Sequence, residues 1–121
     1  MAAPNLRNPL TITGKTSITS SVSTSLTAYL TNSVSSNKVF KINSIFAANK
    51  NGSNTSTVTV SVYNGSTDVY LGYTISVPAD ATQVISTKET YFYLEEGWSI
   101  RAQAGTASYI DLVISYEEIS N

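Results

Sequence analysis

The chain reads Thr57-Val58-Thr59-Val60-Ser61-Val62 near its midpoint, so that a valine alternates with a hydroxyl side chain at every step. Successive side chains of a β-strand point to opposite faces of the sheet, which places the valines on one face and the hydroxyls on the other. Valine and threonine are also enriched in strands, because branching at Cβ suits a pleated surface. The stretch therefore predicts a β-strand with one buried face.

The same alternation recurs on both sides of this stretch. The residues expected to share inward faces are Leu26, Ala28 and Leu30, then Phe40, Ile42 and Phe46, then Leu71, Tyr73, Ile75 and Val77, then Trp98, Ile100, Ala102 and Ala104, and finally Ile110, Leu112 and Ile114. Ser44 interrupts the second of these sets, and we expect a β-bulge near it. Each set predicts another half-buried strand.

Turn signals separate these segments, for example Asn64-Gly65 and Gly105-Thr106. We count seven to nine short strands at intervals of about 8–12 residues, with no convincing helical pattern. A chain of 121 residues has the length of one domain and can bury one core. We therefore predict an all-β fold, a single β-sandwich or jelly-roll-like domain over residues 11–121.

The composition removes most enzyme chemistries. The chain contains no histidine and no cysteine, while 19 serines and 16 threonines occupy 35 of its 121 positions. Without the two missing residue types, no imidazole or thiolate is present to activate a nucleophile or to hold a zinc ion. We expect a structural or binding protein rather than an enzyme, with no catalytic residue, no metal site and no cofactor.

Charge and hydropathy limit the partners. The net charge is −1, and the seven Lys and Arg residues are scattered, whereas a protein that binds duplex nucleic acid usually shows a basic stripe. No apolar run approaches the roughly 20 residues that span a bilayer, and the first ten residues lack the pattern of a secretory signal. We expect no nucleic acid, no membrane, and folding in a cytoplasm.

Residues 1–10 contain two prolines, Pro4 and Pro9. Proline favours extended geometry in the residue before it and has no N–H to donate to a sheet. We predict an extended N-terminal arm over residues 1–10. The arm is either a disordered terminus or a segment that becomes ordered on a neighbouring subunit, with Leu6 and Arg7 as its contacts.

Eight tyrosines make an interaction surface the leading candidate site. Those expected on outward strand faces are Tyr63, Tyr70, Tyr91, Tyr93 and Tyr109. Exposed tyrosines are common anchors of protein interfaces, and their rings can also stack on sugars. A protein–protein interface is the favoured interpretation, with plain sheet surface and carbohydrate binding as the alternatives.

The eight carboxylates give little sign of catalysis. A glycosidase needs two carboxyl groups about 5–9.5 Å apart across one bond. The neighbours Glu95-Glu96 and Glu117-Glu118 would point to opposite faces of a strand, so we expect solvated charges instead. The run Asn49 to Asn54 offers amides but no acid, which predicts only a weak calcium site.

Six segments carry a family resemblance. They are Ala3-Pro4-Asn5-Leu6-Arg7-Asn8-Pro9, Ile12-Thr13-Gly14-Lys15-Thr16, Asn37-Lys38-Val39-Phe40-Lys41-Ile42-Asn43-Ser44-Ile45, Val58-Thr59-Val60-Ser61-Val62-Tyr63, Tyr93-Leu94-Glu95-Glu96-Gly97-Trp98-Ser99-Ile100 and Ile114-Ser115-Tyr116-Glu117-Glu118-Ile119. In this order they resemble small virion structural proteins of tailed bacteriophages, including cyanophages and other marine phages. The resemblance spans nearly the whole chain, and its motifs are structural rather than catalytic.

The resemblance implies a non-enzymatic role in the virion, assembled in the host cytoplasm. Capsid decoration is the first expectation: a cement protein that holds the major capsid protein or other virion subunits through its arm and sheet surfaces. A homo-oligomer such as a trimer is expected as well. The alternatives are a tail, neck or fibre component that binds a host-surface glycan, a small glycan-active enzyme, and a cellular β-sandwich binding module.

Overall fold

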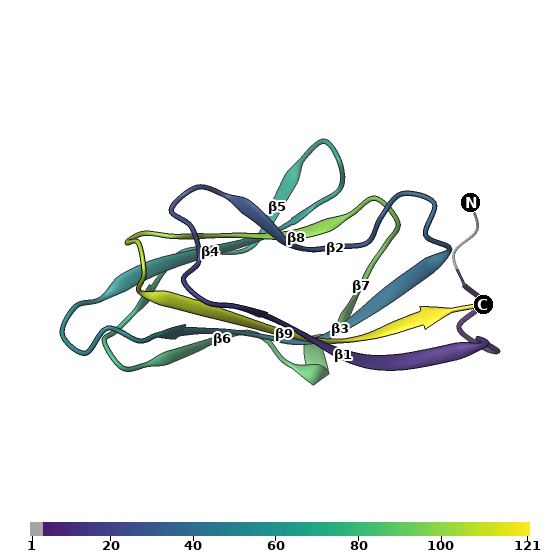
Figure 1. Ribbon diagram of the computed structural model, residues 1–121, viewed down its shortest axis with the longest axis horizontal. Coiled ribbons are helices and arrows are strands. Elements are labelled where there is room, and N and C mark those ends of the chain that lie inside the picture. Colours follow the sequence, from purple (N-terminus) through teal and green to yellow (C-terminus); the bar gives the residue numbers. More distant parts are fainter. Residues whose placement is uncertain (1–3) are drawn as a thin grey trace.

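The computed structural model describes residues 4–121, which form two antiparallel β-sheets stacked face to face (Figure 1). Sheet A has the strand order β1 (Thr11–Thr19), β9 (Ile110–Ser120), β3 (Lys38–Asn49) and β6 (Thr82–Ser86), and β7 (Phe92–Leu94) also pairs with β3. Sheet B has the order β2 (Thr27–Thr31), β8 (Ser99–Ala104), β4 (Ser56–Tyr63) and β5 (Asp68–Val77). A short 3₁₀ turn, η1 (Lys88–Thr90), connects β6 with β7. The predicted all-β sandwich is confirmed, and its jelly-roll variant stays a prediction.

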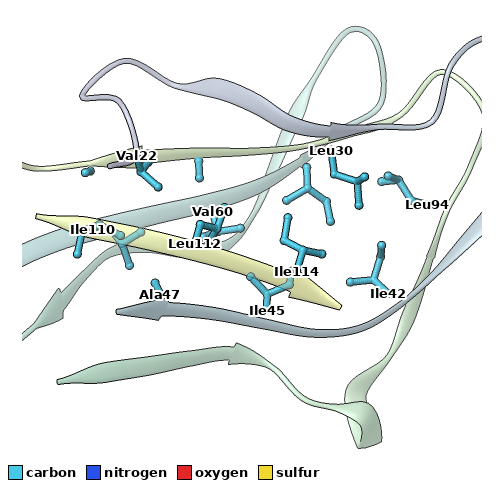
Figure 2. Packing of buried hydrophobic residues seen from close by; sticks show 14 of the residues in the cluster. Val22, Leu30, Ile42, Ile45, Ala47, Val60, Leu94, Ile110, Leu112 and Ile114 are labelled. Carbon is cyan, nitrogen blue, oxygen red and sulfur yellow. The ribbon is translucent and has the colours of Figure 1, made fainter. Parts of the chain in front are cut away.

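The hydrophobic core fills the space between the two sheets (Figure 2). The predicted inward positions are confirmed along β4, β8 and β9, where these residues are at most 1% exposed: Val58, Val60, Ile100, Ala102, Ala104, Ile110, Leu112 and Ile114. The prediction that only one face of β4 is buried is wrong, because Thr59 and Ser61 on its other face are 5% and 0% exposed. Val62 and Trp98 pack against this cluster while keeping part of their surface exposed. Apolar burial on this scale is the main stabilising contribution available to a chain without disulfides.

The expected bulge in β3 is present, but it changes which residues face inward. The pairing of β3 with β9 shifts between Ile42 and Ser44, so Asn43 is an extra residue on the β3 side. An extra residue reverses the in–out alternation beyond it. Ile45 is therefore fully buried, whereas Phe46 is 37% exposed on the outer face. The prediction that Phe46 faces the core is wrong for this reason.

Strand β5 departs from its predicted pattern in the same way. Its register with β4 passes from Val58↔Ile75 to Val60↔Gly72, so two residues, Tyr73 and Thr74, lie opposite one. Val77 is buried and Ile75 packs against the core, as predicted. Tyr73 is 66% exposed, however, and its predicted inward orientation is wrong because the bulge turns it outward.

Leu71 is also exposed, which contradicts its predicted inward position. The β4–β5 pairing shifts a second time between Val60↔Gly72 and Ser61↔Tyr70. Leu71 is therefore an extra residue on the β5 side, and it does not follow the in–out alternation of the strand. In β2, a shift between Ala28 and Leu30 buries Leu30 and leaves Ala28 exposed, so the prediction for Ala28 is wrong too. All of these corrections have one cause, an irregularity in strand pairing.

Two asparagines with fully or nearly fully buried side chains fix the ends of β3. The Nδ2 of Asn32 donates to the carbonyl oxygens of Lys38, where β3 begins, and of Leu94 in β7, at 2.9 and 3.0 Å. The Nδ2 of Asn49, at the end of β3, donates to the carbonyl oxygens of Asn54 and Val77, both at 2.9 Å. Buried carbonyl groups without a partner are costly, so these amides satisfy the backbone where the ladders stop.

The residues before β1 form a turn in the part that the structure describes. The N–H of Asn8 donates to the carbonyl oxygen of Asn5 at 3.2 Å, and the N–H of Arg7 donates to the Oδ1 of Asn5 at 3.0 Å. Residues 1–3 lie outside the described residues, and the arm over residues 1–10 stays a prediction.

One carboxylate connects the three long strands of sheet A. Glu118 of β9 forms an ion pair with Lys15 of β1 at 2.6 Å and a second one with Lys38 of β3. Hydrogen bonds from Lys15 and Lys38 hold the pKa of Glu118 below its ordinary value of 4.5. The same carboxylate raises the pKa of Lys15 above 10.5. The folded protein therefore favours the ionised forms of Glu118 and Lys15.

This arrangement predicts an acid-sensitive contribution to stability. Because the pKa of Glu118 is lower in the folded protein, the contribution is complete above the unfolded value of 4.5 and is lost as the pH falls through the folded pKa. We expect the Tm of the Glu118→Gln variant, measured by circular dichroism, to fall less than that of the unmodified protein between neutral pH and about pH 2.

The matched control is Glu89→Gln, which removes an exposed carboxylate from η1 and should follow the curve of the unmodified protein. Parallel curves for the Glu118→Gln variant and the unmodified protein would contradict the assignment of acid sensitivity to Glu118.

Candidate functional site

The five tyrosines predicted to lie on the surface do not form a single cluster. Tyr63 and Tyr70 belong to β4 and β5 of sheet B, whereas Tyr93 lies in β7 of sheet A and Tyr91 directly precedes it. Tyr109 precedes β9, packs partly against the core, and accepts a hydrogen bond from the Nδ2 of Asn54 at 3.1 Å. The two sheets therefore present two separate aromatic surfaces.

On the outer face of sheet B, side chains from three strands join around Arg101 of β8. Its guanidinium group lies over the ring of Tyr63, 4.5 Å from the centroid, and pairs with Asp68 of β5 at 3.1 Å. Asp68 also accepts a hydrogen bond from Ser61 of β4 at 2.9 Å. These contacts hold the charged groups of Arg101 and Asp68 in place on this face.

Tyr70 and Tyr73 form an exposed aromatic pair on the same face. Their ring centroids are 4.8 Å apart with an interplanar angle of 74°, and the two residues are 46% and 66% exposed. Strict alternation along β5 misses Tyr73, because the bulge sets its direction. Gly72 beside it is the one local signal, since glycine inside a strand often marks a bulge.

Next to Tyr73 lies a hollow of about 240 Å³ in the outer face of sheet B. Its lining includes Thr57, Thr59, Tyr73, Thr74, Gln103 and Gly105. Residues of β4 occupy its middle, with β5 on one side and β8 on the other, in agreement with the strand order. Hydroxyl, amide and aromatic groups therefore meet in one concave site.

Sheet A carries a different kind of surface. Tyr91 and Tyr93 form an edge-to-face pair with centroids 5.8 Å apart, and the Nζ of Lys41 lies 4.4 Å from the centroid of Tyr91. This pair is at the β7 edge of the sheet, because Tyr93 pairs with Lys41 of β3. The Lys41 contact fixes the ring of Tyr91, which is 47% exposed.

An apolar row crosses the outer face of sheet A. The strand register aligns Ile18 with Val113, Val113 with Phe46, and Phe46 with Val84, so that the row runs through β1, β9, β3 and β6. Ile18 is 78% exposed, Val84 44% and Phe46 37%. An open hollow of about 410 Å³ adjoins Ile18 and Val113. An aligned row of partly exposed apolar residues is a candidate interaction surface.

Several carboxylates have structural partners. Asp111 accepts hydrogen bonds from the Nζ of Lys50 at 2.7 Å and from the N–H of Ser21 at 2.8 Å, and both lower its pKa. Glu117 accepts a hydrogen bond from the Nδ2 of Asn43 at 3.0 Å. Among residues 4–121, no group of His, Cys, Asp and Glu residues is arranged to hold a metal ion.

Leu6 and Arg7, the predicted contacts of the arm, are both exposed in the turn before β1, and Leu6 is 47% exposed. Their role in an interface, like that of the five tyrosines, stays a prediction. In the described part of the chain, no helix has the length and hydropathy needed to cross a bilayer.

No protein-family model, no curated protein and no solved structure matches this chain.

Proposed function

We propose that the chain is a structural protein of a phage virion, a capsid decoration protein that stabilises the shell through the outer face of sheet A. The apolar row of Ile18, Val113, Phe46 and Val84 is the observation that carries this proposal. Its members come from four strands that are not consecutive in the chain, and their alignment presents one apolar surface to a partner. Burial of such a surface stabilises a protein complex.

The β1 edge of sheet A supports the same proposal. β1 is nine residues long, pairs with β9 on one side, and is the last strand in the order of the sheet. The backbone N–H and C=O groups on the other side of an edge strand can pair with a strand of another subunit. Ile18 belongs both to this edge and to the apolar row, so one partner can use both.

The arm and the number of copies complete the proposed mechanism. Leu6 and Arg7 lie just before β1, where they can extend a contact made along the edge strand. Each contact is modest, but a shell that carries many copies gains a large total stabilisation. The proposed partners are the major capsid protein or other virion subunits, with self-association into a homo-oligomer.

The proposal predicts that polar substitutions in the apolar row weaken binding to the shell. We expect the double variant Ile18→Ser, Phe46→Ser to bind purified shells of the encoding phage at least about tenfold more weakly than the unmodified protein in a sedimentation assay, since each tenfold corresponds to about 1.4 kcal/mol. Ile18 is 78% exposed but Phe46 only 37%, so we expect Phe46→Ser to cost some stability, and circular dichroism checks that the variant is folded before binding is compared.

Val69→Ser is the matched control, because Val69 is 63% exposed but belongs to sheet B. Its binding should equal that of the unmodified protein, and an unchanged affinity of the double variant would contradict the proposal. Quantitative mass spectrometry of purified virions tests the location. Hundreds of copies agree with a shell protein, whereas about three to a dozen indicate a tail or neck component.

A further inference from the structure

We propose that the hollow in sheet B is a binding site for one neutral sugar ring. In this site Tyr73 forms the stacking wall, and Thr57, Thr59 and Gln103 supply hydrogen bonds. The site lies on the sheet opposite to the apolar row, in the layer of β2, β4, β5 and β8 (Figure 1). Sugar binding at this place therefore does not depend on which virion component the protein contacts.

The β5 bulge builds the wall of the site at a conformational cost. Thr74 has a φ of 47°, a left-handed conformation that is rarely adopted by a β-branched residue. Its N–H donates to the Oγ1 of Thr59 at 2.9 Å, and this bond holds the bulge against β4. A regular strand would have turned Tyr73 toward the core. The strained backbone instead presents the Tyr73 ring beside the hydroxyl groups of β4.

The middle of the hollow depends on a glycine. A Cβ atom at Gly105 would come within 2.3 Å of the Oγ1 of Thr57 and within 3.3 Å of its backbone nitrogen. The N–H of Gly105 donates to the carbonyl oxygen of Thr57 at 2.8 Å, so the backbone cannot simply move away. Glycine at this position therefore keeps the Thr57 hydroxyl accessible from the outside.

The chemistry of the lining favours an uncharged, hydroxyl-rich ligand. Hydroxyl and amide groups line the hollow together with the Tyr73 ring and Ala104, and no charged side chain of residues 4–121 does. Thr59 is 5% exposed and accepts the hydrogen bond from Thr74, yet a hydroxyl that accepts one bond still has its own hydrogen to donate. The Nε2 of Gln103 already donates to the carbonyl oxygen of Thr24 at 2.8 Å, so its Oε1 is the acceptor that it offers to a ligand. An apolar ligand would cover these hydroxyl and amide groups without bonding to them, and an anionic ligand would find no cation in this lining.

A sugar ring fits these requirements. It has a face of C–H groups that can lie against an aromatic ring and a rim of hydroxyls that can donate and accept hydrogen bonds. The volume of about 240 Å³ is below the range of about 300–1,000 Å³ typical of sites for larger ligands, which suits one ring. For such a small contact we expect a dissociation constant on the order of 1–10 mM. Many copies on one particle would raise the effective affinity.

The test is an NMR titration of the isolated full chain with the methyl glycosides of glucose, galactose, mannose and N-acetylglucosamine. We expect at least one of them to give saturable shifts at the backbone amides of Thr59, Thr74 and Gly105. Tyr73→Ala should weaken this binding at least about tenfold, whereas Tyr73→Phe, which keeps the ring, should remain within about threefold. Tyr73 is 66% exposed, so both variants should fold.

Tyr91→Ala is the matched control, since it removes a tyrosine of similar pairing geometry from sheet A and should leave sugar binding unchanged. The proposal is overturned by the absence of saturable shifts with all four neutral glycosides, by equal binding in Tyr73→Ala, or by a response to N-acetylneuraminic acid alone. Because the experiment uses no shell, its outcome is separate from that of the decoration proposal.

Discussion

Replacement of Ile114 by alanine is expected to lower the free energy of unfolding by about 2–5 kcal/mol, the range for large-to-small changes in a packed core. Ile114 is 1% exposed and lies on β9, which pairs on both sides within sheet A. The substitution removes apolar contacts with the core and leaves a cavity that the flanking β1 and β3 cannot easily close. Urea unfolding followed by circular dichroism measures the change.

Ile18→Ala is the matched control, because Ile18 lies on the neighbouring strand and aligns with Val113, one position from Ile114. It is 78% exposed, so its removal should change stability by no more than about 0.5 kcal/mol. Similar losses in the two variants would mean that the two faces of sheet A have been assigned the wrong way round. The pair thus tests the fold as well as the size of the effect.

The regular strands of this fold are predictable from the sequence, for a physical reason. In β4, β8 and β9 the inward apolar residues alternate with polar ones, and a period of two in hydrophobicity directly reflects a strand with one apolar face. In β4 the outward hydroxyl residues Thr59 and Ser61 are buried as well, which the period does not show. The buried positions of Val60, Ile100 and Leu112 follow from this local pattern alone. The class of fold then follows from the number and spacing of such strands.

The errors lie where a bulge intervenes. A bulge is a property of two paired strands, and its position depends on a partner that is distant in sequence, such as β9 for β3. Ser44 is a usable signal for a bulge, but it does not show that the alternation reverses after it and exposes Phe46. Gly72 likewise indicates the bulge in β5 that exposes Tyr73. A prediction based on alternation alone ignores this glycine.

The candidate surfaces are less predictable than the fold. The apolar row requires the register of four strands, and no window of the sequence contains more than one of its members in a recognisable pattern. Alternation identifies Tyr63, Tyr70 and Tyr93 as outward residues, but it misses Tyr73 and does not show that Tyr109 packs partly against the core. The distribution of the tyrosines over two sheets depends on strand order, which periodicity does not determine. The apolar row and the tyrosine surfaces can therefore be identified only when the pairing of strands distant in sequence is known.

Replacement of Asn32 by leucine is the second change with a large expected effect, about 2–5 kcal/mol of lost stability, because several buried groups lose their partners at once. Asn32 is fully buried, and its Nδ2 donates to the carbonyl oxygens of Lys38 and Leu94. Its Oδ1 accepts a hydrogen bond from the hydroxyl of Ser36 at 2.5 Å. Leucine has the same number and branching of side-chain heavy atoms but no polar atom, so these partners lose their bonds. A buried polar group left without a partner costs about 1–3 kcal/mol.

Asn64→Leu is the control, because Asn64 is exposed in the turn between β4 and β5 and the N–H groups of Ser66 and Thr67 that donate to its side chain can turn to water. We expect a loss of less than about 1 kcal/mol for this variant in the same urea titration. If Asn32→Leu were as mild as the control, the backbone ladder between β3 and β7 and the packing of the core would be enough to hold this junction. A large difference instead shows that the hydrogen bonds of the buried amide strengthen this junction beyond the backbone ladder of β3 and β7.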